Sequence, residues 1–110
     1  MKPDVSLIFV TCNSEVSAIA MVRSLVEESL IACGNIVPRV RSIYSWKGEV
    51  EEEEEVLVII KTTDSMSNSV VSRIVTEHPY DTPEVLKVAV EGGCEPYLEW
   101  VRHTAKGKII

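Results

Sequence analysis

Apolar and polar residues follow two different periods along the chain, and the first of them is typical of a β-strand. Residues 5–12 are almost all apolar and rich in β-branched side chains, as in a central strand covered on both faces. Asn13 or Ser14 can then cap a helix, because either side chain can accept a backbone N–H bond. In that helix the apolar residues recur every three or four positions and predict one buried face, made of Ile19, Val22, Val26 and Leu30. We expect the helix to end near residues 29–31.

The middle of the chain predicts a long β-hairpin. Residues 32–37 have strand character until Pro38, which lacks a backbone N–H and so belongs at a sheet edge or a β-bulge. Two further β-rich runs follow, residues 40–46 and 50–62. The dipeptide Lys47-Gly48 separates them, and we interpret it as the tip of the hairpin.

Five consecutive glutamates, residues 51–55, lie in the second strand of this hairpin. A two-residue turn predicts three facing pairs, Trp46 with Glu49, Tyr44 with Glu51, and Arg41 with Glu54. Three of the glutamates then line one face and two the other, because side chains alternate along a strand. The run is either an acidic patch that attracts cations or a solvated arm whose charges prevent unwanted strand pairing.

The last part of the chain predicts a second helix, a strand and a terminal helix. Asp64 can cap the second helix, and Pro79 ends it at His78 because a proline disfavours helical backbone before it. Its apolar side is formed by Met66, Val70 and Ile74. Residues 84–90 read as a strand, and Pro96 suits the first turn of a helix that carries Leu98 and Val101. The order βαββαβ with an additional C-terminal helix predicts an α+β, ferredoxin-like fold.

Chain length bears on how the hairpin is packed. The 110 residues suffice for one domain, residues 1–110, with a diameter of about 34 Å. A strand over residues 50–62 spans about 43 Å and therefore projects beyond that body. Two arrangements cover its aromatic residues: the hairpin packs against another copy of the chain, or a bulge folds it back over its own sheet.

Composition excludes several classes of protein. Eleven basic and seventeen acidic residues give a formal charge of −6, which repels phosphate backbones, so we expect no nucleic-acid partner. Cys12, Cys33 and Cys94 are odd in number and widely spaced, which indicates neither a disulfide framework nor a thiolate zinc site. This fits a reducing, cytoplasmic location, and the apolar run near the N-terminus is too short to span a membrane.

Several segments resemble the CutA family of divalent-cation tolerance proteins. They are Ala32-Cys33-Gly34-Asn35-Ile36, Ser42 to Gly48, Glu55-Val56-Leu57 leading to Ile60-Lys61-Thr62, His78 to Glu84, and Tyr97-Leu98-Glu99-Trp100. Together they span nearly the whole chain in order. The resemblance implies a ferredoxin-like subunit of a homotrimer built through the long hairpin, similar in shape to the nitrogen-regulatory PII proteins.

The resemblance also implies a metal ligand. The family is associated with tolerance to copper and other divalent metals, and the histidine of its His-Pro-Tyr segment is a proposed ligand, here His78. In some bacterial members a second histidine and a cysteine accompany it, and here Glu77 and Val10 stand at those positions. We therefore expect His78 and Glu77 to be the candidate ligands for Cu(II) or another divalent cation, with no obligatory cofactor. The alternative is that His78 makes structural hydrogen bonds near a helix C-terminus.

The remaining candidates belong to boundaries between subunits. We expect Tyr44 and Trp46 at an interface, and Lys61 and Tyr80 in a cleft between copies. No nucleophile with a neighbouring base is evident, so we expect a non-enzymatic protein. Two functions compete: a homotrimer in metal-ion tolerance, and a PII-like signalling or scaffolding trimer that binds a small molecule or partner protein at intersubunit clefts.

Overall fold

The computed structural model describes residues 4–107, so the ends of the predicted domain 1–110 lie outside the described residues. Within this range the elements are β1 (Val5–Cys12), α1 (Glu15–Glu27), β2 (Cys33–Trp46), β3 (Glu49–Thr63), α2 (Asp64–Glu77), β4 (Val85–Val90) and α3 (Glu95–Thr104). The predicted order is confirmed. The two runs expected before the hairpin tip form the single strand β2.

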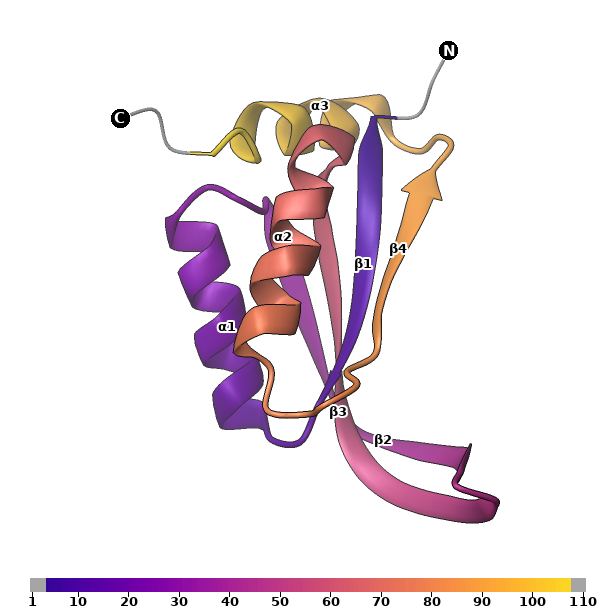
Figure 1. Ribbon diagram of the computed structural model, residues 1–110. Helices are drawn as coiled ribbons and strands as arrows, with labels where there is room; N and C mark the ends of the chain where they lie inside the picture. Colours follow the sequence, from indigo (N-terminus) through magenta and orange to yellow (C-terminus); the bar gives the residue numbers. More distant parts are fainter. Residues whose placement is uncertain (1–3, 108–110) are drawn as a thin grey trace.

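The strands form one antiparallel sheet with the order β2-β3-β1-β4. Helices α1 and α2 lie side by side on one face of this sheet, and α3 crosses its end (Figure 1). This is the predicted ferredoxin-like α+β arrangement. Strand β1 is central, as its nearly continuous apolar sequence indicates, and β2 and β4 are the edges.

The core lies between the sheet and the two helices. On this face, which we call the helix-covered face, alternate residues of β1 and β3 are completely buried: Ile8, Val10, Val58 and Ile60. They pack against Leu25 of α1 and against Val70 and Ile74 of α2. Alternation along each strand thus sends one set of apolar side chains into this core and leaves the other set for the opposite face.

Helix α1 buries a different face from the one predicted. Ile19 and Val26 are 42% and 40% exposed, and the buried residues are Ala18, Val22 and Leu25. The small side chain of Ala18 allows a close approach to the sheet, and this rotates the helix so that two larger residues face water. The helix also ends earlier than predicted, at Glu27, and Ser29 follows in the left-handed region with φ 58°.

Both helices on the sheet begin at hydroxyl caps. Ser14 accepts the N–H of Ser17 at 3.1 Å, which selects one of the two predicted caps of α1. The prediction that Asp64 caps α2 is wrong, because Thr63 accepts the N–H of Met66 and Asp64 lies in the first turn. Thr63 is also the last residue of β3, so strand and helix join without a loop.

The hairpin projects from the body as an arm, which we define as residues 40–55 (Figure 1). The predicted facing pairs of the hairpin are confirmed, and a bulge lies between Val37 and Val40, at the predicted proline. The molecule is 43 Å long in its longest direction. Folding back over the sheet is excluded, since Trp46 is 49% exposed and Ile43 64%.

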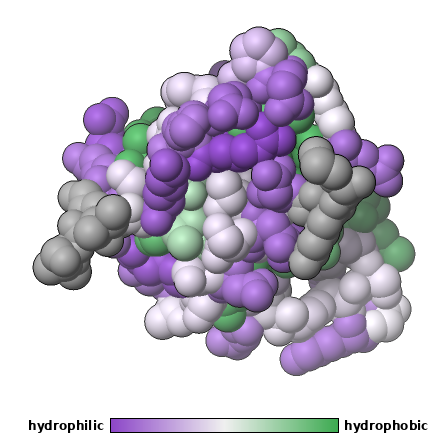
Figure 2. All heavy atoms as spheres, turned by 90° about the horizontal axis from the view of Figure 1, so that it is seen from above, coloured by the Kyte–Doolittle hydropathy of each residue, from purple (hydrophilic) through white to green (hydrophobic). Residues whose placement is uncertain are grey.

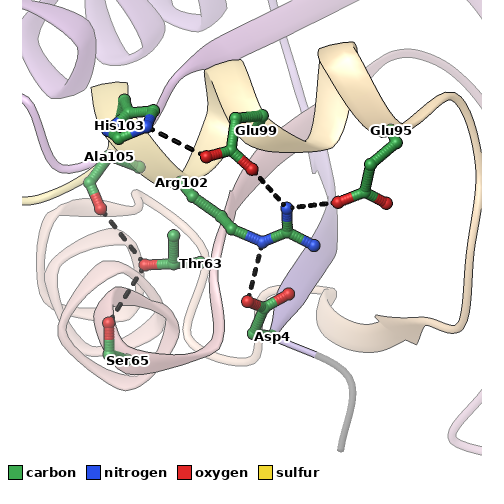
Figure 3. Close-up of polar contacts among 8 residues, drawn as sticks. All are labelled: Asp4, Thr63, Ser65, Glu95, Glu99, Arg102, His103 and Ala105. Carbon is green, nitrogen blue, oxygen red and sulfur yellow. Dashed lines mark hydrogen bonds and ion pairs between the residues drawn. The ribbon is translucent and has the colours of Figure 1, made fainter. Parts of the chain in front are cut away.

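Helix α3 closes one end of the molecule. Leu98 and Val101 pack on Val5 and Ala32 in a second small cluster. On its outer side Arg102 pairs with Asp4, Glu95 and Glu99, as shown in Figure 3. Seen from this end the surface is mostly hydrophilic (Figure 2).

Candidate functional site

His78 is held by two hydrogen bonds just after the end of α2. Its Nε2–H donates to the carbonyl of Thr11 at 2.8 Å, and its Nδ1 accepts the backbone N–H of Tyr80 at 3.1 Å. An acceptor at Nδ1 leaves the proton on Nε2, so the two bonds together define a neutral tautomer. The ring therefore ties the end of β1 to the loop that follows α2. This is the structural role weighed for His78 in the sequence.

Tyr80 extends this connection to the root of the arm. Its ring lies 4.6 Å from that of His78, and its hydroxyl donates to Glu55 at 3.1 Å. Burial and this carboxylate raise the pKa of Tyr80 to about 12. Glu55 is 8% exposed although it belongs to the run of glutamates, so it is a buried anchor and not part of a solvated edge.

Glu77, the second predicted ligand, is committed to a salt bridge. Its carboxylate accepts from Arg73 at 2.7 Å, one turn earlier on α2. The same guanidinium reaches Glu28 at the end of α1, also at 2.7 Å. These carboxylates raise the pKa of Arg73, which therefore stays charged and joins the two helices.

A cavity of about 290 Å³ lies beside these residues, between the start of α1 and the end of α2. Cys12, Met21, Glu77 and His78 are among the residues that line it. Burial, and then the charge of Glu55, raise the pKa of the Cys12 thiol. Within residues 4–107 no three His, Cys, Asp or Glu side chains are grouped closely enough to hold a metal ion. Val10 is fully buried in the core.

The face of the sheet opposite α1 and α2 carries apolar residues that neither of these helices covers. We call it the open face, and its apolar residues are Leu7, Phe9, Val37, Leu57, Ile59, Leu86 and Val88. Helix α3 covers only the end near Val5 and Val90. Leu86 is 57% exposed and Val88 44%, which is unusual for apolar residues within a sheet face.

The arm carries both residues predicted at an interface. Tyr44 and Trp46 lie on the continuation of the open face, opposite Glu51 and Glu49. The hydroxyl of Tyr44 donates to Glu53 at 2.5 Å, which raises the pKa of Tyr44 to about 12. No subunit contact is needed to fix the tyrosine, but nearly half of the Trp46 surface remains exposed.

Within one subunit the two predicted cleft residues lie near different positions along β3. Lys61 is opposite Cys33 near α3, whereas Tyr80 contacts Glu55. Six positions of β3 separate Lys61 from Glu55, about 20 Å along a strand. On α3, Tyr97 and Trp100 pair with ring centroids 5.5 Å apart.

Sequence analysis missed two connections. Arg73 joins α1 to α2, and Glu55 joins the arm to Tyr80. The spacing of Arg73 and Glu77 is a helical i, i+4 pair and offered a signal for the first. Cys33 is partly exposed and lies on the open face, opposite Lys61.

Comparison with known proteins identifies the family. The family model of the CutA1 divalent ion tolerance protein matches residues 6–104. Human protein CutA is 44% identical over 102 residues, which are 93% of this chain and 57% of the human protein, so the chain spans little more than half of that relative. The divalent-cation tolerance protein CutA of Thermus thermophilus is 41% identical over 87% of this chain and 93% of its own.

Solved structures agree with the sequence comparison. The Thermus thermophilus CutA1 structure superposes with a TM-score of 0.88 at 38% identity, over 93% of this chain and 99% of the other. CutA1 from a Shewanella bacterium gives a TM-score of 0.90 at 34% identity, over 96% and 98% of the two chains. The chain therefore belongs to the CutA1 divalent ion tolerance family.

Proposed function

We propose that this protein works as a non-enzymatic homotrimer in the response to divalent metal ions. The observation that carries the proposal is the open face, an apolar sheet surface continuous with the two aromatic residues of the arm. Surfaces of this kind on a folded chain mark sites of association. The number of copies comes from the family resemblance.

The arrangement of the strands supports a closed ring. Both outer strands, β2 and β4, present an open edge, and the arm prolongs β2 beyond the body (Figure 1). An edge of one copy that meets a different edge of the next makes a heterologous contact, and such contacts form a ring when the rotation between copies closes. The arm would then lie on the neighbouring sheet, which covers Tyr44 and Trp46.

Sedimentation velocity tests the assembly. Leu86→Asp places a charge on the open face at a residue that is already 57% exposed, so the fold tolerates it. We expect the wild-type chain to sediment as a trimer and this variant to dissociate. Val16→Asp, on the outer side of α1 at 80% exposure, is the matched control and should leave the trimer intact. A monomeric wild-type chain overturns the proposal.

Metal binding at His78 and Glu77 is a separate part of the family function. Within one subunit these residues do not make a metal site, because both ring nitrogens of His78 are engaged and Glu77 is paired with Arg73. To bind a cation, His78 would have to give up one of its two hydrogen bonds. A further ligand would have to come from another copy of the chain. The two residues therefore stay predicted ligands of Cu(II) or another divalent cation.

Calorimetric titration with Cu(II) decides this point. If His78 is a ligand, His78→Ala abolishes the heat of binding and Glu77→Gln weakens it. His103→Ala is the control, because His103 is an exposed histidine paired only with Glu99 within the described residues. Unchanged copper binding in His78→Ala rejects His78 as a ligand.

The absence of catalysis and the cytoplasmic location are part of the same proposal. A nucleophilic cysteine needs a lowered pKa, and that of Cys12 is raised. His78 has no ring nitrogen left to act as a base for it. None of the helices within residues 4–107 is long and apolar enough to cross a membrane.

A second candidate function is a PII-like trimer that binds a small molecule between copies. The observation that favours it is Lys61, a charged residue in the apolar open face. Adding metabolites during sedimentation separates this candidate from metal tolerance, because only a cleft ligand should change the assembly without copper.

A further inference from the structure

Lys61 occupies an unusual place on the open face. It lies on β3 between Leu7 of β1 and Cys33 of β2, which are its direct partners across the sheet. Within residues 4–107 its ammonium group makes no side-chain hydrogen bond and no ion pair, whereas Lys87 of the edge strand β4, on the helix-covered face, pairs with Asp64 at 2.8 Å. Lys61 is only partly exposed as a residue, and no counter-charge contacts it within the described residues.

Two further polar groups lie beside this lysine. Cys33 is the cross-strand partner of Lys61, so the two side chains point to the same face and are adjacent. Tyr97 of α3 reaches Cys33, and burial followed by the charge and hydrogen bond of Cys33 raises the pKa of its phenol. An ammonium, a thiol and a phenol can all donate hydrogen bonds.

The acidic groups nearby are engaged elsewhere. Asp4, Glu95 and Glu99 on this side of the molecule converge on Arg102 (Figure 3). On β3 itself the nearest carboxylate of the same face is Glu55, which is six residues away and bonded to Tyr80. The surroundings of Lys61 thus offer donors, and these nearby carboxylates are held by other partners.

Association through the open face would change the energetics of this lysine. A second copy that covers Leu7 and Ile59 also covers Lys61, because all three lie on the same face of adjacent strands. Burying an ammonium without a counter-charge is strongly unfavourable, and an anion that accepts its hydrogen bonds removes the penalty. An assembly that buries the ammonium group of Lys61 would therefore need a negative group at this position.

We propose that Lys61, Cys33 and Tyr97 form an anion site that takes a carboxylate at the boundary between copies. The proposal rests on the self-association proposed above and names the ligand chemistry of the cleft. The carboxylate comes either from an acidic side chain of a second copy or from a free small carboxylate, for which citrate is the probe.

Equilibrium sedimentation with and without citrate, in a buffer free of other carboxylates, tests the site. Lys61→Met removes the charge and keeps an unbranched side chain one atom shorter, and Lys61→Arg retains the charge. Lys106→Met, at an exposed position beyond α3, is the matched control. Each variant is compared with the wild-type chain by its dissociation constant.

The two sources of the carboxylate give different results. If a second copy supplies it, Lys61→Met weakens the assembly by about tenfold or more, Lys61→Arg retains it, and citrate has no effect on the wild type. If a free carboxylate is bound, citrate tightens the wild-type assembly by a similar factor and leaves Lys61→Met unchanged. The proposal is overturned if Lys61→Met assembles as tightly as the wild type and citrate affects neither.

A wild-type chain that stays monomeric in both buffers overturns the proposed self-association. Citrate binding to the monomer then tests the anion site by itself. Citrate-induced shifts of the backbone amide signals of Cys33, Lys61 and Tyr97 support the site. Their absence in such a monomer overturns it. The failure of the assembly and the failure of the site are thereby distinguished.

Discussion

Strand β3 passes through two environments, and its two halves differ in what holds them in place. From Val56 onward alternate residues are buried in the core under α1 and α2, with Val58 and Ile60 fully buried. Before Glu55 every residue of the strand is exposed. One half is fixed by packing and the other by its turn and its pairing with β2.

The difference separates the requirements for folding from those for association. The body buries its apolar residues within one chain, whereas the arm and the open face leave theirs exposed. Turn geometry substitutes for a core in the arm: Lys47 and Gly48 both have positive φ, 51° and 81°, as a tight two-residue hairpin requires. Substitutions in the two regions should therefore affect different measurements.

The largest contrast in stability is expected within β3 itself. Ile60→Ala should lower the free energy of unfolding by about 2–5 kcal/mol, because it leaves a cavity at a fully buried site. Val50→Ala, at 78% exposure in the arm, should change it by less than about 0.5 kcal/mol. Urea denaturation at one protein concentration measures both. Equal losses would show that the arm is as tightly packed as the body.

Gly34 in β2 and Gly48 in the turn should each be sensitive to substitution, but for different physical reasons. A Cβ at Gly34 would lie 2.7 Å from Cγ1 of Val22, so Gly34→Ala should cost about 1–3 kcal/mol by overpacking. Gly48 has open space around it, and Gly48→Ala should cost about 1–2 kcal/mol through its left-handed backbone alone.

A double substitution distinguishes these two causes. Val22→Ala should offset part of the loss in Gly34→Ala, because it removes the clashing methyl groups, and it should have no such effect on Gly48→Ala. Thermal denaturation of the single and double variants gives the coupling. Simple additivity at Gly34 would contradict the overpacking mechanism.

The smallest effect concerns two tyrosines held by glutamates. The pKa of Tyr80 at the root of the arm and that of Tyr44 within it are both raised to about 12. An unfolded tyrosine ionises near pH 10, so this contribution to stability is complete below about pH 10 and is lost as the pH rises toward 12. Phenolate absorbance should show both rings ionising late.

Removal of each acceptor tests this assignment. Glu55→Gln should lower chiefly the pKa of Tyr80, and Glu53→Gln chiefly that of Tyr44. Each substitution should lower the pKa of the other tyrosine by a smaller amount, because both carboxylates act on both rings. Tyr80→Phe should also reduce the loss of stability at alkaline pH. Ionisation of either tyrosine at the ordinary pH in the folded wild-type protein would rule out its hydrogen bond to glutamate.

Most of the fold was predictable because periodicity and turn residues report on local structure. The hairpin register followed from Lys47-Gly48, and the bulge from Pro38. The buried face of α1 was not predictable in the same way. Helix α1 has more apolar residues than one helical face can bury. Packing against the sheet selects the face that contains the small residue Ala18.

The candidate site was less predictable than the fold. Sequence reasoning selected His78 as a ligand or structural residue, but its partners, Thr11 and Tyr80, are fixed only by how β1 ends beside α2. Glu55 looked like one more solvated glutamate. Glu55 differs from the other glutamates of the run only because Tyr80, in a loop distant in sequence, donates a hydrogen bond to it.

The bulge before the arm shifts the alternation of side chains along β2 by one residue. Between Val37 and Val40 strand β2 has two residues where β3 has one, and Arg39 adopts φ 62° there. Odd-numbered residues of β2 face the open side before this point, and even-numbered ones after it. Deleting Arg39 would restore the uninterrupted alternation and turn Tyr44 and Trp46 to the opposite side. A single inserted residue thus decides which surface of the arm the aromatic rings occupy.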